Sequence, residues 1–465
     1  MLRIFKQYYP IRHVFFVIGE FCCIYIAVLA ATWLLMGAQP FTLANWISRK
    51  AFLIAVVSHV SLYYNDLYDP GLWTSFGELG LRLIQSLGFA SIFLAGVYFV
   101  FPQAIIGKGV YAISVVCVAA LVIAWRCGYF LVLKHNILDE NIIILGSGPF
   151  AREIIHQIHE KKDCGYAIAL VVLENINDAL ELYGLKIPTL YKNNLENLES
   201  LARHLKVKKI VVALSDQRGH LPVNELLKCR VSGINVIDGT SYYEMLTGKL
   251  LVEQIKPAWL IFSDGFRKSA LRRFVKRTID IGLSFVLSAG LLPLLVLTAL
   301  LIKLDSKGPV FFSQERVGAR RRTYMVHKFR SMIADAEQGT GPVWASEEDP
   351  RITRVGRIIR KLRIDELPQI WNVLKGNMSF VGPRPERPFF VGQLIETVPY
   401  YEQRFSVKPG ITGWAQVSYG YGASAEDAVE KLNYDLFYIK NMTIFMDLMI
   451  VLRTVKIVLF GKGAR

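Results

Sequence analysis

Four long apolar segments in the first third of the chain constrain its fold more than any other feature. They lie near residues 13–37, 50–65, 79–102 and 109–133. A helix needs about 20 consecutive apolar residues to cross the hydrocarbon core of a bilayer, and most of these segments reach that length. We therefore expect a membrane protein of the α/β class whose residues 1–137 form a region of four transmembrane helices.

The charge balance favours partners with negative charge. The chain has 465 residues, of which 53% are hydrophobic, and its formal net charge is +16. Residues 266–465 hold 31 Lys and Arg against 18 Asp and Glu, so most of the excess lies in the last part of the chain. A basic surface can attract nucleic acid, but apolar segments between the charges favour an anionic lipid surface and phosphorylated substrates. We expect membrane lipids as a partner and no nucleic acid.

Basic residues predict how the chain is oriented in the membrane. Arg3, Lys6 and Arg12 precede the first apolar segment, and an excess of Lys and Arg marks the cytoplasmic side. Four crossings return the chain to that side. Arg49 and Lys50 lie in the first connection and count against this orientation. We expect the remainder of the chain on the cytoplasmic side.

A glycine-rich turn follows the last of these apolar segments. Residues 141–145 form a strand pattern, and Gly146-Ser-Gly148-Pro-Phe-Ala leads into a helical pattern. Glycines at this spacing permit a tight turn and the close approach of a phosphate to a helix N-terminus. Gly146 and Gly148 are therefore candidate nucleotide-binding residues. Because Pro149 enters the turn and Glu174 is only loosely placed to bind a ribose, scaffolding or regulation without a nucleotide is an equal alternative.

Strand-like runs continue after the turn. They lie near residues 167–173, 209–214 and 234–237 and alternate with helical stretches. This alternation is typical of a parallel sheet with helices on its faces. We expect a Rossmann-like domain over residues 138–262.

A fifth apolar run, at about residues 278–302, has basic residues at both ends. Such flanks are expected when both ends stay on the cytoplasmic side, and the internal Pro293 marks a place where a helix can break. We expect a re-entrant helix that enters and leaves on one side of the membrane. Ser288 is a candidate partner for backbone groups exposed at the break. This helix opens a third domain, residues 263–465.

An adjacent carboxylate pair, Asp365-Glu366, stands among fixed cations in the third domain. Arg360 and Arg363 precede the pair, and Arg384 follows it between two prolines. Two neighbouring acids can divide the work of attacking a phosphorus atom and holding a divalent cation, while arginines bind phosphate oxygens. An acidic pair followed by Leu-Pro can also be a simple helix end. The surrounding cations favour phosphate chemistry.

The alternating run Tyr324–Arg330 adds two further cations. In a strand, alternate residues share a face, so Lys328 and Arg330 are expected on one side. They are candidates for the active site or for a surface that meets lipid head groups.

The chain resembles the bacterial sugar transferases that load a polyprenyl-phosphate carrier, also called monotopic phosphoglycosyl transferases. The resemblance rests on these blocks: Lys307-Gly-Pro-Val-Phe-Phe-Ser-Gln-Glu-Arg-Val-Gly318, His327-Lys-Phe-Arg-Ser-Met332, Asp365-Glu366-Leu-Pro, Val381-Gly-Pro-Arg-Pro385, Lys408-Pro-Gly-Ile-Thr-Gly-Trp414 and Tyr434-Asp-Leu-Phe-Tyr-Ile-Lys440. The front half looks like the large subgroup of that family, with a four-span membrane region and a Rossmann-like domain. One departure is Asn377, where the family often has Asp, which puts a metal role at that position in doubt.

The resemblance implies an α-rich monotopic catalytic domain in the bacterial inner (cytoplasmic) membrane. The implied reaction moves hexose-1-phosphate from a UDP-hexose to polyprenyl (undecaprenyl) phosphate and releases UMP, as the first membrane step of exopolysaccharide, capsule or O-antigen biosynthesis. Asp365 would be the nucleophile that forms a phosphosugar-aspartate, and Glu366 would hold Mg²⁺. Arg384 and Arg360 would bind phosphate, with the part of Arg363 left open.

Two other functions compete with this one. The Rossmann-like domain could be an oxidoreductase, although the stretch after the glycine-rich turn has no suitable Tyr-x-x-x-Lys pair. The protein could instead be a non-enzymatic membrane adaptor of polysaccharide assembly, in which case replacing Asp365 would be harmless. Four extra spans without evident chemistry also make a homodimer a reasonable hypothesis.

Overall fold

The structure is a computed structural model of the 465-residue chain. It describes residues 2–4, 7–37, 46–68, 76–107, 109–134, 139–161, 164–174, 187–191, 197–215, 221–255, 265–266, 268–333, 349–420, 422 and 424–460. Apart from short N-terminal segments, residues 8–239 form one compact unit and residues 240–465 a second. The strands β1 (Leu2–Ile4) and β2 (Gln7–Tyr9) form a small sheet near the N-terminus.

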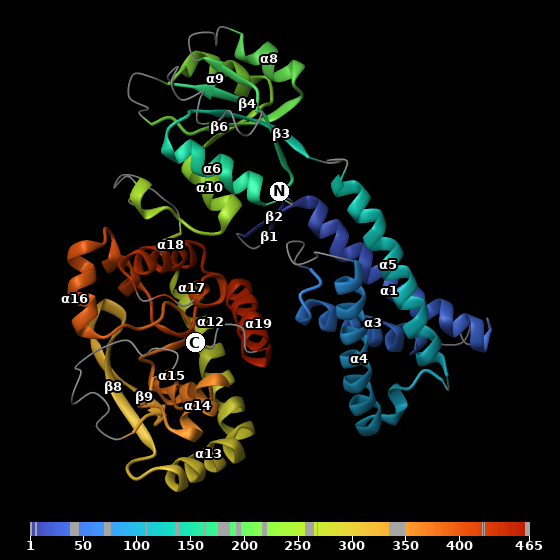
Figure 1. Ribbon diagram of the computed structural model, residues 1–465, viewed down its shortest axis with the longest axis vertical. Helices are drawn as coiled ribbons and strands as arrows, with labels where there is room; N and C mark the ends of the chain where they lie inside the picture. The colour runs from blue at the N-terminus through green and yellow to red at the C-terminus, as the bar shows by residue number, and fades with distance from the viewer. Residues whose placement is uncertain are drawn as a thin grey trace. The chain divides into compact units, whose positions relative to one another are not determined.

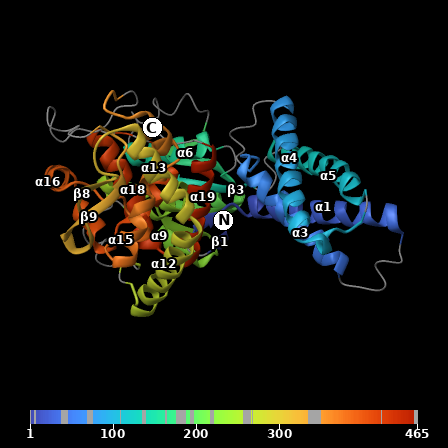
Figure 2. The same cartoon turned by 90° about the horizontal axis from the view of Figure 1, so that it is seen from below.

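The first unit begins with four helices that gather in one bundle (Figures 1 and 2). They are α1 (Ile11–Met36), α3 (Trp46–Tyr64), α4 (Phe76–Val100) and α5 (Val110–Lys134). Within the described ranges, α1, α4 and α5 are long and apolar enough to cross a membrane. The helix α3 is not among them, because Arg49 and Lys50 fall inside its first turns and lower its mean hydropathy. All four predicted segments are therefore helices, and three of them qualify as membrane spans.

A buried ion pair fixes how α1 packs on α5. The Nε atom of Arg126 lies 2.6 Å from Oε1 of Glu20, and both side chains are almost fully buried. Arg126 also donates to the carbonyl of Leu67 at 2.7 Å, which ties the turn after α3 to the same cluster. Buried charges are costly unless they are paired, so this cluster strongly constrains the register of the bundle.

The helix contact is close because α1 offers a glycine. A β-carbon at Gly19 would overlap the indole of Trp125, whose Nε1 donates to the carbonyl of Phe16 at 3.1 Å.

The rest of the first unit is a parallel five-stranded sheet of order β5-β4-β3-β6-β7. Its strands are β3 (Glu140–Leu145), β4 (Tyr166–Leu173), β5 (Thr189–Tyr191), β6 (Val207–Val212) and β7 (Asn235–Asp238). The helices α8 (Leu198–His204) and α9 (Val223–Val231) cover one face, and α6 (Pro149–Glu160) lies on the other (Figure 1). The predicted α/β domain with a parallel sheet is confirmed, and β5 is a strand that the sequence pattern did not indicate.

A broken helix pair dominates the early part of the second unit. The helix α12 (Ala270–Gly290) is followed by α13 (Leu292–Asp305), and their axes are bent by 62°. Pro293 lies in the first turn of α13, where its missing N–H costs nothing. Ser288 lies on the last turn of α12, and the main-chain N–H of Leu291 closes that turn on the carbonyl of Leu287 at 2.9 Å. The predicted break near Pro293 is present.

The remaining elements of the second unit pack around one large apolar core and two smaller apolar clusters. A hairpin of β8 (Phe311–Val317) and β9 (Thr323–Phe329) is antiparallel, and β10 (Ser379–Val381) pairs in parallel with β11 (Gly410–Thr412). The helices are α10 (Gly239–Thr247), α14 (Arg354–Lys361), α15 (Ile370–Lys375), α16 (Pro388–Thr397), α17 (Trp414–Ser418), α18 (Ala425–Asn441) and α19 (Ile444–Phe460). The short 3₁₀ helices are η2 (Pro102–Ala104) in the first unit, and η5 (Val252–Gln254), η6 (Ala319–Arg321), η7 (Ile364–Gln369) and η8 (Tyr401–Ser406) in the second.

Candidate active site

The carboxylate pair lies on η7, directly after a sharp break in the chain. The helix α14 ends at Lys361, and Arg363 then adopts a left-handed conformation with φ 57°. This conformation is uncommon for a residue with a β-carbon and ends the helix abruptly. Asp365 and Glu366 follow in the first turn of η7, and their exposed fractions are only 9% and 6%. The break therefore turns both acids into the interior of the second unit.

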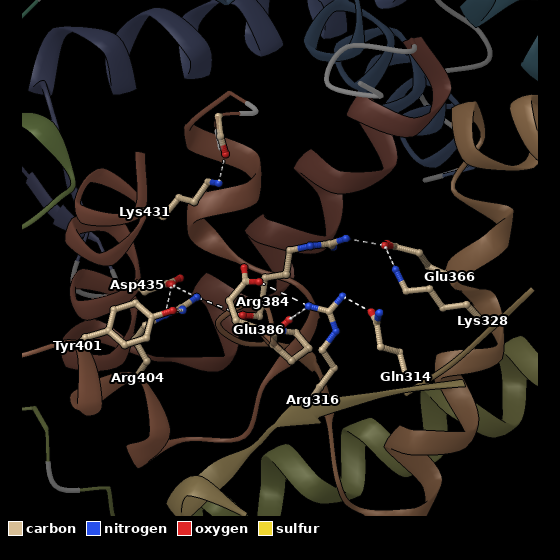
Figure 3. A network of polar contacts seen from close by, with 12 residues as sticks. Gln314, Arg316, Lys328, Glu366, Arg384, Glu386, Tyr401, Arg404, Lys431 and Asp435 are labelled. Carbon is tan, nitrogen blue, oxygen red and sulfur yellow. Dashed lines mark hydrogen bonds and ion pairs between the residues drawn. The ribbon is translucent and has the colours of Figure 1, made fainter. Parts of the chain in front are cut away.

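Three cations lie around Glu366, and Figure 3 shows two of them, Lys328 and Arg384. Its Oε1 accepts hydrogen bonds from Nζ of Lys328 at 3.0 Å and from Nη2 of Arg384 at 2.8 Å, and Oε2 lies 3.9 Å from Nη1 of Arg363. Burial alone would raise the pKa of Glu366. The charges of Arg384, Lys328 and Arg363 outweigh it and hold that pKa well below its usual range, so this carboxylate stays ionised.

Asp365 has the opposite character. Burial, together with the negative charge of Glu366, raises the pKa of Asp365 to about 6, although Lys328, Arg363 and Arg360 act to lower it. Its Oδ1 atom is buried and finds no hydrogen-bond partner among the residues that the structure describes. A carboxylate that is desolvated, unbonded and still mostly ionised at neutral pH is suited to attack an electrophile.

The structure brings both predicted arginines to the pair. Arg360 in the last turn of α14 acts electrostatically on Asp365, and Arg363 acts on both acids. A continuous helix could not have done this, because the two residues precede Asp365 by five and two positions. The left-handed conformation of Arg363 interrupts the helix and allows both arginines to lie near the pair.

The two cations of the β8–β9 hairpin have separate places. Lys328 lies on β9 and reaches Glu366, with burial lowering the pKa of its amine. Arg330 follows the strand and donates from Nη1 to the carbonyl of Lys307 at 2.9 Å and from Nη2 to that of Ser306 at 2.8 Å. Arg330 thus binds the chain just after α13, and the extended run predicted here is confirmed as β9.

Arg384 approaches from the opposite side of the site. Its side chain is 38% exposed, which leaves room for a ligand beside its contact with Glu366. The loop that carries it is held by two further arginines, Arg316 and Arg404 (Figure 3). Sequence reasoning did not single out Arg404. The sequence offered one indication, because Arg404 is a charged residue close to the start of the Lys408–Trp414 block.

The residues present fit the Mg²⁺ that the family resemblance implies. Among the described residues, no group of three or more His, Cys, Asp and Glu gathers as a complete metal site. Mg²⁺ is commonly bound by one or two carboxylates together with substrate phosphates, and a firmly ionised Glu366 beside the unbonded Oδ1 of Asp365 offers that set. Asn377 is exposed in the turn after α15, where its N–H donates to the carbonyl of Asn372 at 3.1 Å.

Comparison with known proteins identifies the family of the chain. Residues 271–461 match the family model described as bacterial sugar transferase, and residues 64–237 match one described as a CoA-binding domain. A UDP-galactose-lipid carrier transferase of Erwinia amylovora is 32% identical over 359 residues, which cover 73% of this chain and 72% of the relative. The chain belongs to the bacterial sugar transferase family.

Other members of the bacterial sugar transferase family are similar over the C-terminal part. A UDP-N-acetylgalactosamine-undecaprenyl-phosphate N-acetylgalactosaminephosphotransferase of Aeromonas hydrophila is 44% identical over 240 residues, covering 52% of this chain and 56% of the relative. A UDP-glucose:undecaprenyl-phosphate glucose-1-phosphate transferase of Escherichia coli (strain K12) is 41% identical over 191 residues, 40% of each chain. The chain thus spans about half the length, or less, of these two relatives.

A phosphate at the glycine-rich turn of the α/β domain would lie beside the carboxylate of Glu174. The Oε1 atom of Glu174 accepts from the N–H of Ser147 in the turn at 3.3 Å and from the N–H of Ser215, which follows β6, at 3.1 Å. A phosphate placed beside this carboxylate would be repelled. Gly146 is needed for packing, since at φ 132° a β-carbon would overlap the carbonyl of Ala213, and a β-carbon at Gly148 would meet Ser215. Packing is therefore one reason for glycine at both positions, and nucleotide binding by this turn stays a prediction.

Proposed function

We propose that this bacterial sugar transferase moves hexose-1-phosphate from a UDP-hexose to a polyprenyl phosphate, most specifically undecaprenyl phosphate, with release of UMP. The observation that carries the proposal is the division of labour at residues 365 and 366. One carboxylate is held ionised by three cations, and its neighbour is desolvated and has an unbonded oxygen. Both substrates are anionic, so a site that gathers cations around a nucleophile suits their reaction.

In the proposed first step, a carboxylate oxygen of Asp365 attacks the β-phosphorus of the donor. The new O–P bond forms as the bond from that phosphorus to the bridging oxygen breaks, and UMP leaves with the electron pair. In the second step, a phosphate oxygen of the lipid attacks the same phosphorus and releases Asp365 as a free carboxylate. Each step conserves charge and needs no oxidant or reductant.

The surrounding residues bind and orient the phosphates. Arg384 and Lys328 donate to Glu366 in the absence of substrate. When the donor binds, the same guanidinium and ammonium groups are suited to bind its phosphate oxygens. Arg360 and Arg363 add positive charge on the side of α14. Mg²⁺ held by Glu366 would neutralise the diphosphate of the donor when bound.

We also propose that the second unit is anchored by α12 and α13 as a re-entrant pair, with the catalytic and α/β domains on the cytoplasmic side of the inner membrane. Support comes from the 62° bend, from the apolar surface of α13 and from basic residues at both ends. Apolar side chains exposed on α13 include Leu292, Val296, Leu300 and Leu304. A lipid carrier whose phosphate lies at the head groups would then meet Asp365 at the membrane surface.

The test is UMP release by the purified full-length protein in detergent or nanodiscs. UDP-glucose, UDP-galactose and UDP-N-acetylgalactosamine are each supplied with undecaprenyl phosphate and Mg²⁺, because the names of relatives span these three sugars. We expect UMP with one or more donors and none from Asp365→Asn. Equal UMP release by Asp365→Asn, or its absence with every donor in the wild type, would contradict the proposal.

A further inference from the structure

The segment Pro383–Arg384–Pro385 is held almost entirely by its carbonyl groups. Neither proline has an N–H to donate, so the segment cannot be fixed by a regular ladder of hydrogen bonds. Instead, three successive carbonyls accept from three different elements. Pro383 accepts from the N–H of Gly410 at 2.9 Å, Arg384 from Nη2 of Arg404 at 3.1 Å, and Pro385 from Nη1 of Arg316 at 3.1 Å.

The donor to the Arg384 carbonyl is itself locked in place. Arg404 lies on η8 with an exposed fraction of 7%, and Asp435 on α18 has one of 1%. Both Nε and Nη2 of Arg404 contact Oδ2 of Asp435, at 2.9 and 2.8 Å, and Nη1 donates to the hydroxyl of Tyr401. These contacts occupy all three guanidinium nitrogens (Figure 3).

This arrangement does more than attach α18 to the core. A buried ion pair is weak evidence for stability, because the cost of desolvating both charges offsets most of their attraction. Here Nη2 of Arg404, which contacts Asp435, also donates to the main-chain carbonyl of Arg384, whose side chain reaches Glu366. The guanidinium of Arg384 is carried by this backbone, so a shift of the backbone would displace it from the carboxylate.

We propose that Arg404, locked by Asp435, is a positioning residue that fixes the backbone of Arg384 so that its guanidinium meets Glu366 and the donor phosphates. The inference rests on the proposed function, since the phosphates are those of the proposed donor. Arg316 holds the next carbonyl in the same way, with Gln314 accepting from its Nη2 at 2.6 Å. Arg404 touches no substrate in this account and acts only through Arg384.

The test is a double-mutant cycle on kcat/KM for UMP release. Arg404→Lys keeps the charge that pairs with Asp435, but an ammonium cannot reproduce the fork that reaches the Arg384 carbonyl as well. We expect Arg404→Lys to lower kcat/KM about tenfold when Arg384 is present. In an Arg384→Ala background, the same change should cost less than about twofold, because the side chain that it positions is already gone. Equal losses in both backgrounds would overturn the inference.

Controls separate this outcome from general damage. Arg321→Lys alters an exposed ion pair with Glu402, 2.8 Å long on the same unit, and should leave kcat/KM unchanged. If Arg404→Lys fails to fold, Tyr401→Phe decides, because it removes a single hydrogen bond to Arg404. Tyr401→Phe should lower kcat/KM less than Arg404→Lys does, and this effect should vanish in the Arg384→Ala background. A decrease in kcat/KM that persists in that background refutes the proposal. Failure of the wild type to release UMP refutes the proposed function instead, so the two failures are distinguishable.

Discussion

The proton affinity of Asp365 should be unusual in the free enzyme. The difference between a pKa of about 6 and the ordinary value of 3.8 corresponds to about 3 kcal/mol in favour of the neutral acid. Asp365 should then be about nine-tenths protonated at pH 5 and about one-tenth protonated at pH 7. An ordinary aspartate would be almost fully ionised at both values.

Carbodiimide labelling measures this directly, because the reagent reacts with the protonated carboxyl. Metal-free protein in chelator is labelled between pH 4 and 8, and the peptide that contains Asp365 is quantified by mass spectrometry against a small carboxylic acid in the same tube. We expect labelling to fall about tenfold between pH 5 and pH 7 and to change little below pH 5. Labelling that keeps rising steeply from pH 5 to pH 4 would refute the reasoning.

A charge change should move this curve in a known direction. Arg360 favours the ionised form of Asp365, so Arg360→Gln removes a stabilising cation and should shift the midpoint to higher pH. The matched control is Arg357→Gln, an exposed residue of the same helix that is not among the main charges acting on Asp365, and its midpoint should stay close to that of the wild type. A downward shift in Arg360→Gln is incompatible with the electrostatics described above.

Three further predictions concern the scaffold. Millimolar CoA or NAD should not raise the melting temperature of the wild type. Pyrophosphate should raise the melting temperature of Glu174→Ala, because the N–H groups bound by Glu174 are then free to bind an anion. Stabilisation of the wild type by CoA would contradict this prediction. Gly19→Ala should lower the melting temperature in detergent, because the added methyl group overlaps Trp125 and overpacking costs about 1–3 kcal/mol; an unchanged value would show that α1 and α5 can separate freely. Arg277→Met should destabilise the second unit by about 1–3 kcal/mol, since Nη1 and Nη2 cap the carbonyls of Val373 and Leu374 at 2.5 and 2.7 Å, and a neutral result would mean that water replaces the cap.

Many of the helices and strands could be predicted from local sequence patterns. The apolar runs became α1, α3, α4 and α5 because run length and periodicity are local properties. The break at Pro293 was likewise visible, since proline restricts the residue before it wherever it stands. Four of the five parallel strands, all but β5, followed from short β-branched runs between helical stretches.

Some of the residues that meet at the candidate site were predictable from the sequence. Asp365, Glu366 and Arg384 were predicted as candidate site residues because their residue types and spacing suit phosphate chemistry. The contribution of Arg363 was not, because it depends on a single left-handed residue that ends α14 early.

Partners that are distant in sequence could not be predicted. Arg404 meets Asp435 and the carbonyl of Arg384 only because η8, α18 and the proline loop pack together. Arg330 is bound to carbonyls of residues 306 and 307 for the same reason, through the pairing of β9 with β8. Such contacts are decided by tertiary packing, which one sequence without its structure does not reveal.

The central claim is that Asp365 carries the phosphosugar between the two substrates, and the covalent adduct tests it most directly. Purified protein is mixed with each UDP-hexose and Mg²⁺, without lipid acceptor, quenched in acid and examined by intact-mass and peptide analysis. We expect a mass increase of one phosphohexose on the peptide that contains Asp365, lost on addition of undecaprenyl phosphate and absent from Asp365→Asn. Lipid-dependent product formation with no adduct at this residue, or an adduct elsewhere, would contradict the account.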